Sequence, residues 1–168
     1  WRLDPVTFAY TPQNVDKPDT KGATLAVEAR PWKGLTLAAT YSLLVATQQN
    51  TEMDWMTFEE VTVRRKADLV PRHQVTAQAA WEWDTGTRLW ARLLFMSERQ
   101  SRYKPGEPLD PAVVFWAGAS QKLGKGVELF LEAENLLDED YSFQAGLPGD
   151  GNYPAPPLNF LGGLRLSY

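Results

Sequence analysis

Few residues in this chain have the types and spacing that catalysis or metal binding requires. The sequence contains one His and no Cys, which excludes disulfide scaffolds, thiolate catalysis and His-rich metal sites. Ser and Asp residues accompany His73, but no Ser stands in a nucleophile-elbow sequence. We therefore predict a protein that is not an enzyme, needs no cofactor and holds no metal ion.

Weaker candidates for chemistry have simpler interpretations. The run Asp138-Glu139-Asp140 offers the carboxylates that Ca²⁺ prefers, but it lacks the EF-hand pattern and is interpreted as the solvated start of a loop. His73 stands beside Arg72 at a loop-to-strand junction, where a solvated rim residue is expected rather than a ligand contact. Asn135 is expected to stabilise another such junction, and residues 57–66 are interpreted as a solvated loop of mixed charge.

Length and net charge narrow the class of protein. The 168 residues can bury the core of one domain, while a net charge of −4 without a basic cluster gives no basis for binding nucleic acid. The longest apolar run, Pro111 to Ala119, is far shorter than the roughly 18 residues of a membrane helix. Residue 1 is Trp and no signal segment follows it, so we expect a processed product or a fragment.

Alternation of apolar and polar residues predicts an all-β protein. Side chains alternate across a strand, so a period of two indicates strands with two distinct faces. In the segment 113–122 the alternation is too blurred to assign faces, and residues 1–3 are a candidate for a short eighth strand. The expected strands are 24–32, 35–45, 74–83, 87–98, 113–122, 127–134 and 160–168.

The connections alternate strictly between short and long. Three contain a Gly that can supply a positive φ and are predicted to be tight turns: 32–34, 84–86 and 124–126. The long ones are 47–71, 99–110 and 138–157. In an antiparallel meander every second connection lies at the same end of the sheet, so the turns gather at one end and the loops at the other. Outer-membrane β-barrels have this asymmetry as a rule, with short periplasmic turns and long extracellular loops.

One face of the predicted strands is apolar, and the other is rich in charge. Alternation alone does not separate a membrane barrel from a soluble barrel, because the charged face can be either a wet lumen or a wet exterior. We interpret the charged face as the lining of a lumen, since a small dry core could not accommodate so many ions. Its members are Glu28, Arg30, Glu82, Arg88, Arg92, Glu98, Glu128, Glu132, Glu134 and Arg165.

Aromatic residues on the apolar face favour the membrane interpretation. Trp81, Trp83 and Tyr168 stand at the turn end, as in the interfacial girdle of a membrane barrel. The last strand also ends on Tyr168, with apolar residues at every second position before it. Such an end is expected of a closed barrel, which pairs its last strand with its first.

Four stretches resemble one family. Residues 127–141, VELFLEAENLLDEDY, resemble the penultimate strand of TonB-dependent outer-membrane receptors, and residues 158–168, LNFLGGLRLSY, resemble their last strand. Residues 14–41 resemble a recurrent hairpin of those receptors, and Pro71-Arg72-His73 resembles their return from a long extracellular loop. Pro156-Pro157-Leu158 stands where the family usually has Pro-Gly-Arg. The four stretches follow one another in the family's order across nearly the whole chain.

The resemblance implies an antiparallel up-and-down transmembrane barrel segment of about seven or eight strands in the outer membrane of a Gram-negative bacterium. Residues 1–168 would be the C-terminal part of the barrel, without the plug domain and the N-terminal strands. The resemblance also implies that the last strand carries a signal for barrel assembly, formed by Phe160, Leu164, Leu166 and Tyr168. The implied partners are membrane lipid, the barrel-assembly machinery, a TonB complex acting through the plug, and a small ligand such as a ferric siderophore or cobalamin. Aromatic residues of the long loops would contact that ligand: Trp55, Phe58, Tyr103, Tyr141, Phe143 and Tyr153.

Two alternatives remain open from the sequence. One is a self-contained small outer-membrane barrel with a structural or adhesive role. The other is a soluble ligand-binding barrel or sandwich, in which side chains such as Leu25, Leu37, Leu129 and Leu166 would be protected from solvent.

Overall fold

The computed structural model describes residues 2–3, 10–11, 19–54, 56–101, 106–144, 146 and 151–167, and its regular elements are all strands. No helix among these residues is long and apolar enough to cross a membrane. The strands are β1 (Arg2–Leu3), β2 (Tyr10–Thr11), β3 (Asp19–Ala29), β4 (Leu35–Asp54), β5 (Glu59–Lys66), β6 (His73–Glu82), β7 (Thr87–Met96), β8 (Ala112–Gly124), β9 (Val127–Glu134), β10 (Ser142–Gln144), β11 (Tyr153–Pro154) and β12 (Asn159–Leu166).

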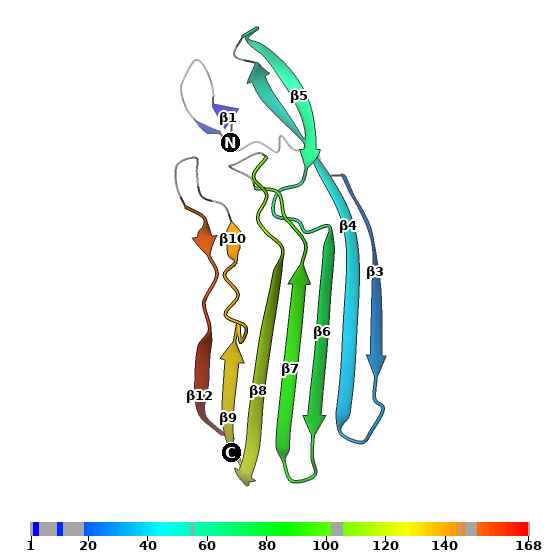
Figure 1. Ribbon diagram of the computed structural model, residues 1–168, viewed down its shortest axis with the longest axis vertical. Helices are drawn as coiled ribbons and strands as arrows, with labels where there is room; N and C mark the ends of the chain where they lie inside the picture. Colours follow the sequence, from blue (N-terminus) through cyan, green and yellow to red (C-terminus); the bar gives the residue numbers. More distant parts are fainter. Residues whose placement is uncertain are drawn as a thin grey trace. The chain divides into compact units, whose positions relative to one another are not determined.

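The chain divides into two compact units. The larger, here called the sheet unit, comprises Gly22–Leu44 and Asp68–Tyr168, and the small unit comprises Trp1–Lys21 and Val45–Ala67. The strands that run through the sheet unit pair antiparallel in the order β12-β9-β8-β7-β6-β4-β3 (Figure 1). These are the seven strands that the alternation predicts, and β12 and β3 are the two edges of the described sheet.

Short and long connections separate to opposite ends of the sheet unit, as predicted. Within the sheet unit, the tight turns after β3, β6 and β8 lie at the lower end in Figure 1, and the long connections after β7 and β9 leave the strands at the opposite end. We call these the turn end and the loop end. At the turn end, Gly126 has φ 76° and Gly34 has φ 80°. An added Cβ at position 126 would clash with the carbonyl oxygen of Ser167, and one at position 34 would clash with that of Glu82. Both positions therefore need Gly for its positive φ and for its lack of a side chain.

The strand register confirms the separation into two faces. One transverse row contains Leu35, Trp81, Leu89, Ala119, Leu131 and Gly162, and the adjacent row on the opposite face contains Thr36, Ala80, Trp90, Gly118, Glu132 and Leu161. We call the first the apolar face and the second the charged face. The apolar face is uncovered, because Leu131 is 56% exposed and Leu164 is 63% exposed.

Register also assigns the faces of β8, which the alternation left open. Phe115 pairs with Leu93 on the apolar face, and Trp116 pairs with Arg92 on the charged face. Val114 lies on the charged face too and is fully buried. The alternation in β8 is blurred because the charged face accepts large apolar side chains in this strand.

Two expectations about segments outside the seven predicted strands are wrong. Residues 57–66 are not a solvated loop: β4 continues to Asp54, and β5 pairs with its end in the small unit. Of the candidate eighth strand at residues 1–3, the described residues Arg2–Leu3 form β1, which pairs with β2 in a separate two-stranded sheet and not with the large sheet. The expected loop 138–157 likewise contains a short hairpin, β10–β11.

Candidate functional site

Oppositely charged side chains pair at the turn end of the charged face. Register places Glu82 beside Arg88 and Glu128 beside Arg165. Nη1 of Arg165 lies 2.7 Å from Oε2 of Glu128, and Nζ of Lys122 lies 3.2 Å from Oε1 of Glu82. Lys122 is missing from the residues predicted for this face, because the blurred alternation of β8 concealed its orientation.

Aromatic rings share the charged face with these ions. The guanidinium of Arg92 lies 5.6 Å from the ring centre of Trp116, and that of Arg165 lies 5.4 Å from the ring centre of Phe130. Gly163 leaves room for the Phe130 ring, which an added Cβ would approach to 3.0 Å. These contacts hold the cations along the sheet surface.

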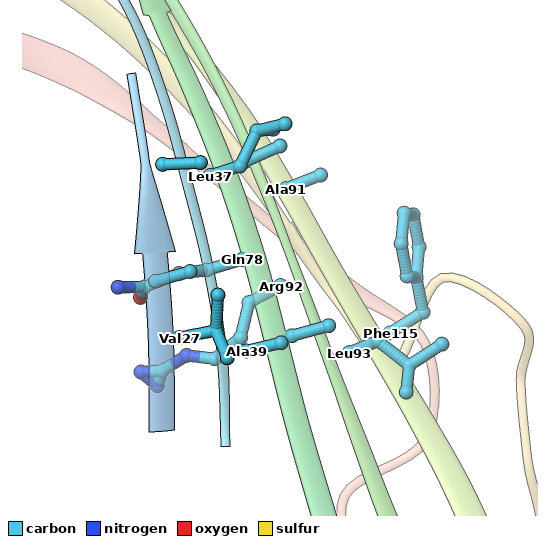
Figure 2. A pocket seen from close by; sticks show the side chains of 12 residues that line it. Val27, Leu37, Ala39, Gln78, Ala91, Arg92, Leu93 and Phe115 are labelled. Atoms are coloured by element: carbon cyan, nitrogen blue, oxygen red, sulfur yellow. The ribbon is translucent and has the colours of Figure 1, made fainter. Parts of the chain in front are cut away.

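Each face of the sheet unit has a shallow hollow. The hollow on the charged face is about 390 Å³, and its lining includes Gln74, Thr76, Gln78, Arg92 and Trp116. The groove on the apolar face is about 380 Å³ and is lined almost entirely by apolar atoms. In Figure 2, Phe115 and the polar ends of Gln78 and Arg92 point in opposite directions from the strands. The two faces therefore differ in chemistry as well as in composition.

The remaining residues predicted for the charged face have clear positions. Glu28 lies at the end of β3 and Arg30 just beyond it, with Nη2 of Arg30 2.7 Å from Oε1 of Glu28, and Glu134 ends β9. Glu98 lies just beyond β7, so it is not on a strand. That the whole set lines a lumen stays a prediction.

Buried polar side chains mark the loop end. Nδ2 of Asn135 donates to the carbonyl oxygens of Glu139 and Pro156 at 2.9 and 3.1 Å, and its Oδ1 accepts a hydrogen bond from the Glu139 N–H at 3.0 Å. Oδ1 of Asp138 accepts one from the Leu158 N–H at 3.0 Å. Asn135 and Asp138 have φ values of 50° and 51°, which Asn and Asp tolerate better than most residues. Asn135 thus stabilises the junction as expected, and the Asp138 carboxylate supports the turn through its hydrogen bond to Leu158.

Arg99 is a buried cation that the sequence analysis missed. Its backbone forms two hydrogen bonds with Leu109, and its Nη2 donates to the carbonyl oxygen of Ser142 at 2.9 Å. Burial lowers the pKa of Arg99, and the nearby Tyr141 partly opposes that shift. Burial also raises the pKa of the Tyr141 phenol. A lone Arg in a loop carries no local pattern that could have identified it.

Three of the aromatic residues predicted to contact a ligand come together on one segment. Tyr141 and Phe143 form an edge-to-face pair with ring centres 5.5 Å apart, and Tyr153 lies on the paired strand β11. Phe58 is exposed in the small unit. Trp55 and Tyr103 lie outside the described residues. Ligand contact by these side chains stays a prediction.

Aromatic pairs lie at both ends of the apolar face. Trp81 and Trp83 stack at the turn end, with ring centres 4.8 Å apart. At the loop end, Tyr41 hydrogen-bonds through its hydroxyl to Nδ1 of His73 at 2.8 Å. Tyr168, expected in the girdle and the assembly signal, lies outside the described residues, whereas Phe160, Leu164 and Leu166 lie on β12. No group of three or more His, Asp or Glu side chains in the described part of the chain could hold a metal ion.

Comparison with known proteins identifies similar folds. The family profile described as TonB dependent receptor-like, beta-barrel matches residues 2–136. A search of curated proteins finds no match. Among solved structures, the siderophore receptor PiuA from Acinetobacter baumannii aligns with a TM-score of 0.76 at 16% identity, over 99% of this chain and 24% of PiuA.

Two further receptors have similar structures. The ferric-catecholate import receptor Fiu from E. coli K12 aligns with a TM-score of 0.69 at 15% identity, over 90% of this chain and 21% of Fiu. The ferripyoverdine receptor of the Pseudomonas aeruginosa outer membrane aligns with 0.68 at 14% identity, over 97% of this chain and 21% of that receptor. The chain therefore spans about a quarter or less of these receptors' length, and at such identities the likeness is one of fold.

Proposed function

Because the chain belongs to the TonB-dependent receptor family of β-barrels, we propose that it is the C-terminal barrel part of an outer-membrane receptor that imports a scarce ligand. The observation that carries this proposal is the uncovered apolar face of a sheet whose other face is charged. A metal chelate is the ligand class favoured by the comparisons, since the similar structures are named as receptors for siderophores, ferric catecholates and ferripyoverdine. Cobalamin is the alternative cargo.

The apolar face would contact lipid. Its large side chains are exposed as they would need to be against hydrocarbon, and Trp81 and Trp83 would lie at the membrane boundary at the turn end. Side chains that a soluble barrel would protect are open instead, with Leu25 65% exposed and Leu166 71% exposed. This exposure favours the membrane proposal over the soluble alternative.

The charged face would line the lumen, where its ions and polar hollow would meet water or a plug domain. The loop end would face outward and bind the ligand through Tyr141, Phe143 and Tyr153, together with Trp55, Phe58 and Tyr103. Energy would come from a TonB complex acting through the plug. The barrel-assembly machinery would recognise the apolar positions of β12.

Uptake by the full-length receptor tests the transport proposal. Cells expressing it should accumulate iron from a radiolabelled ferric siderophore, and deletion of TonB should abolish the accumulation. Labelled cobalamin serves as the alternative cargo. A receptor that reaches the outer membrane but takes up neither compound would favour the structural or adhesive alternative.

A pair of adjacent substitutions tests the membrane orientation. Leu131→Arg would place a charge on the proposed lipid face and should destabilise the folded receptor by about 2 kcal/mol or more. Glu132→Arg changes charge on the opposite face and is the matched control, with a much smaller effect. Unfolding in urea, measured in lipid vesicles, compares the two, and equal effects would contradict the orientation.

A further inference from the structure

The charged face has two sectors of different chemistry, a difference that the proposed function does not use. Where β4 pairs with β6, four opposite pairs of side chains lie on this face, and every member of them is uncharged. The strands β7, β8, β9 and β12 carry ions instead, among them Arg88, Lys122, Glu132 and Arg165. We call the uncharged pairs the neutral strip: Thr36 with Ala80, Ala38 with Gln78, Thr40 with Thr76, and Ser42 with Gln74.

The polar side chains of the neutral strip are largely unengaged. Ser42 alone among them has a side-chain hydrogen bond within the described part of the chain, to the hydroxyl of Thr24 at 3.1 Å. In the other sector, by contrast, Nδ2 of Asn159 donates to Oε2 of Glu134 at 3.1 Å. The strip therefore offers hydroxyl and amide groups that can exchange hydrogen bonds with water or with a solute.

The hollow on the charged face lies on this strip. Its volume is about 390 Å³, and its lining includes Ala38, Thr40, Gln74, Thr76 and Gln78. Arg92, the only charged residue among the described residues that line it, lies 5.6 Å from the ring centre of Trp116 on β8, which is the neighbour of β7 away from the strip. At the usual rise of a strand, the strip extends for about 20 Å from Thr36 to Ser42. That length is most of the apolar band of a membrane barrel, which is about 25 Å tall.

We infer that the neutral strip is the wall along which the imported ligand passes through the barrel, and that it binds the ligand's uncharged hydroxyl, amide and carbonyl groups. This inference rests on the proposed function and locates the path of that transport. A fixed charge on the wall would hold an ion of opposite sign and repel one of like sign. Neutral groups replace the ligand's water one hydrogen bond at a time, and each bond is weak enough to be exchanged as the ligand moves.

Two cysteine variants of the full-length receptor test the path, because this chain contains no Cys of its own. Gln78→Cys places a thiol on the strip, and Glu134→Cys places one in the same transverse row on β9, where the native side chain is also exposed. Cells are treated with a bulky maleimide, and mass spectrometry measures the modified fraction. Uptake of a radiolabelled ferric tris-hydroxamate and of labelled cobalamin is then compared with binding of the same compounds to cells that lack TonB.

Modification at position 78 should slow uptake about tenfold or more, because it narrows the path. Binding should change less than about twofold, since the loop end is untouched. The unmodified Gln78→Cys receptor and the modified Glu134→Cys receptor should both import within about twofold of the parent rate.

A second variant tests the chemistry of the strip rather than its space. Thr76→Val combined with Gln78→Met keeps the size of both side chains and removes their hydrogen-bonding groups. Uptake should slow about threefold or more at unchanged binding. Unchanged uptake would overturn the role of these groups in passage.

Other outcomes would overturn the path itself. Equal slowing by the two modified cysteine variants would mean that no wall is preferred, and normal uptake after modification at position 78 would place the path elsewhere. A thiol at position 78 that cannot be modified in importing cells would contradict the inference too, since a passing ligand needs access to it. Loss of binding in proportion to uptake would assign the effect to the loop end. These results leave the proposed function standing, whereas an unmodified receptor that imports neither compound would refute it and the inference together.

Discussion

At the turn end of the sheet unit the strands are joined by backbone that passes close to backbone, whereas at the loop end they are joined by buried side chains. The carbonyl oxygens of Gly34, Gly86 and Gly126 accept hydrogen bonds from the N–H groups of Glu82, Lys122 and Ser167 at 3.0, 3.1 and 2.8 Å. At the loop end, Asn135 and Arg99 reach other segments through their side chains.

The difference follows from what each end must do. The residues of a tight turn determine its conformation by themselves, because a Gly with positive φ fixes the path of the chain within a few residues. The conformation of a loop of about twenty residues is not determined locally in this way. Hydrogen bonds of buried polar side chains must therefore hold the ends of the loop against the sheet. Loops can then extend from a fixed base, which would suit the proposed ligand-binding surface.

Gly126→Ala should have the largest effect on stability. At the turn end it both places Ala at a positive φ and adds a Cβ where there is no room for one. The residue has φ 76°, and an added Cβ would clash with the carbonyl oxygen of Ser167. We expect a loss of about 3 kcal/mol or more in the free energy of unfolding. Urea unfolding of the full-length receptor in lipid vesicles measures the loss.

Two other glycines separate the contribution of backbone conformation from that of steric space. Gly106 has φ 91° but open space around it, so Gly106→Ala should cost about 1–2 kcal/mol through conformation alone. Gly124 has neither constraint, and Gly124→Ala should be nearly neutral. If all three variants lose the same stability, close backbone approach does not hold the turn end.

Asn135→Ala should have the next largest effect and acts at the loop end. It removes the three hydrogen bonds of the buried Asn135 side chain and takes these partners from the backbone of Glu139 and the carbonyl of Pro156, at a cost of about 2–4 kcal/mol. Proteolysis of residues 139–157 should accelerate, and cleavage followed by mass spectrometry measures this. Asn135→Gly relieves the positive φ but loses the same bonds. A stable Asn135→Gly variant would mean that conformation, not hydrogen bonding, explains the need for Asn.

The faces of the sheet could be predicted because alternation is a local property of a strand. Phe160 and Leu164 reveal their face through residues two positions away, so no partner strand is needed. Trp116 could not be assigned, because its place opposite Arg92 depends on the register with β7. The end of β4 was missed for a related reason: residues 47–54 are mostly polar and have no apolar face to signal a strand.

The loop end was predictable only where a family pattern extends over it. Asn135 could be interpreted as a junction residue from its position after a clear strand. The burial of Arg99 could not be predicted, because its partner Ser142 is distant in sequence but within hydrogen-bond distance in the structure. Side-chain contacts between loops produce no periodic pattern in the sequence.

Asp138→Ala tests a smaller part of the loop end. It removes the hydrogen bond to the Leu158 N–H and places Ala at a φ of 51°, so the unfolding free energy should fall by about 1–2 kcal/mol. Asp138→Asn retains both the acceptor and the tolerance of that φ, and should be nearly neutral. A different outcome would give the carboxylate charge a role in cation binding. In that case Asp138→Asn would lose much stability, and added Ca²⁺ would stabilise the unmodified protein but not this variant.

Lys122→Met should have the smallest effect, and it tests whether charge contributes to the turn end at all. The ion pair of Lys122 with Glu82 is more than half exposed on both sides, so solvent and salt screen it and its removal should cost less than about 1 kcal/mol. Lys125→Met, in the adjacent turn, is the control, since Lys125 forms no ion pair with any residue the structure describes. Unfolding at low and high salt separates the two variants. A loss from Lys122→Met as large as that from Gly126→Ala would reverse the comparison, because the turn end would then depend on charged side chains rather than on its backbone.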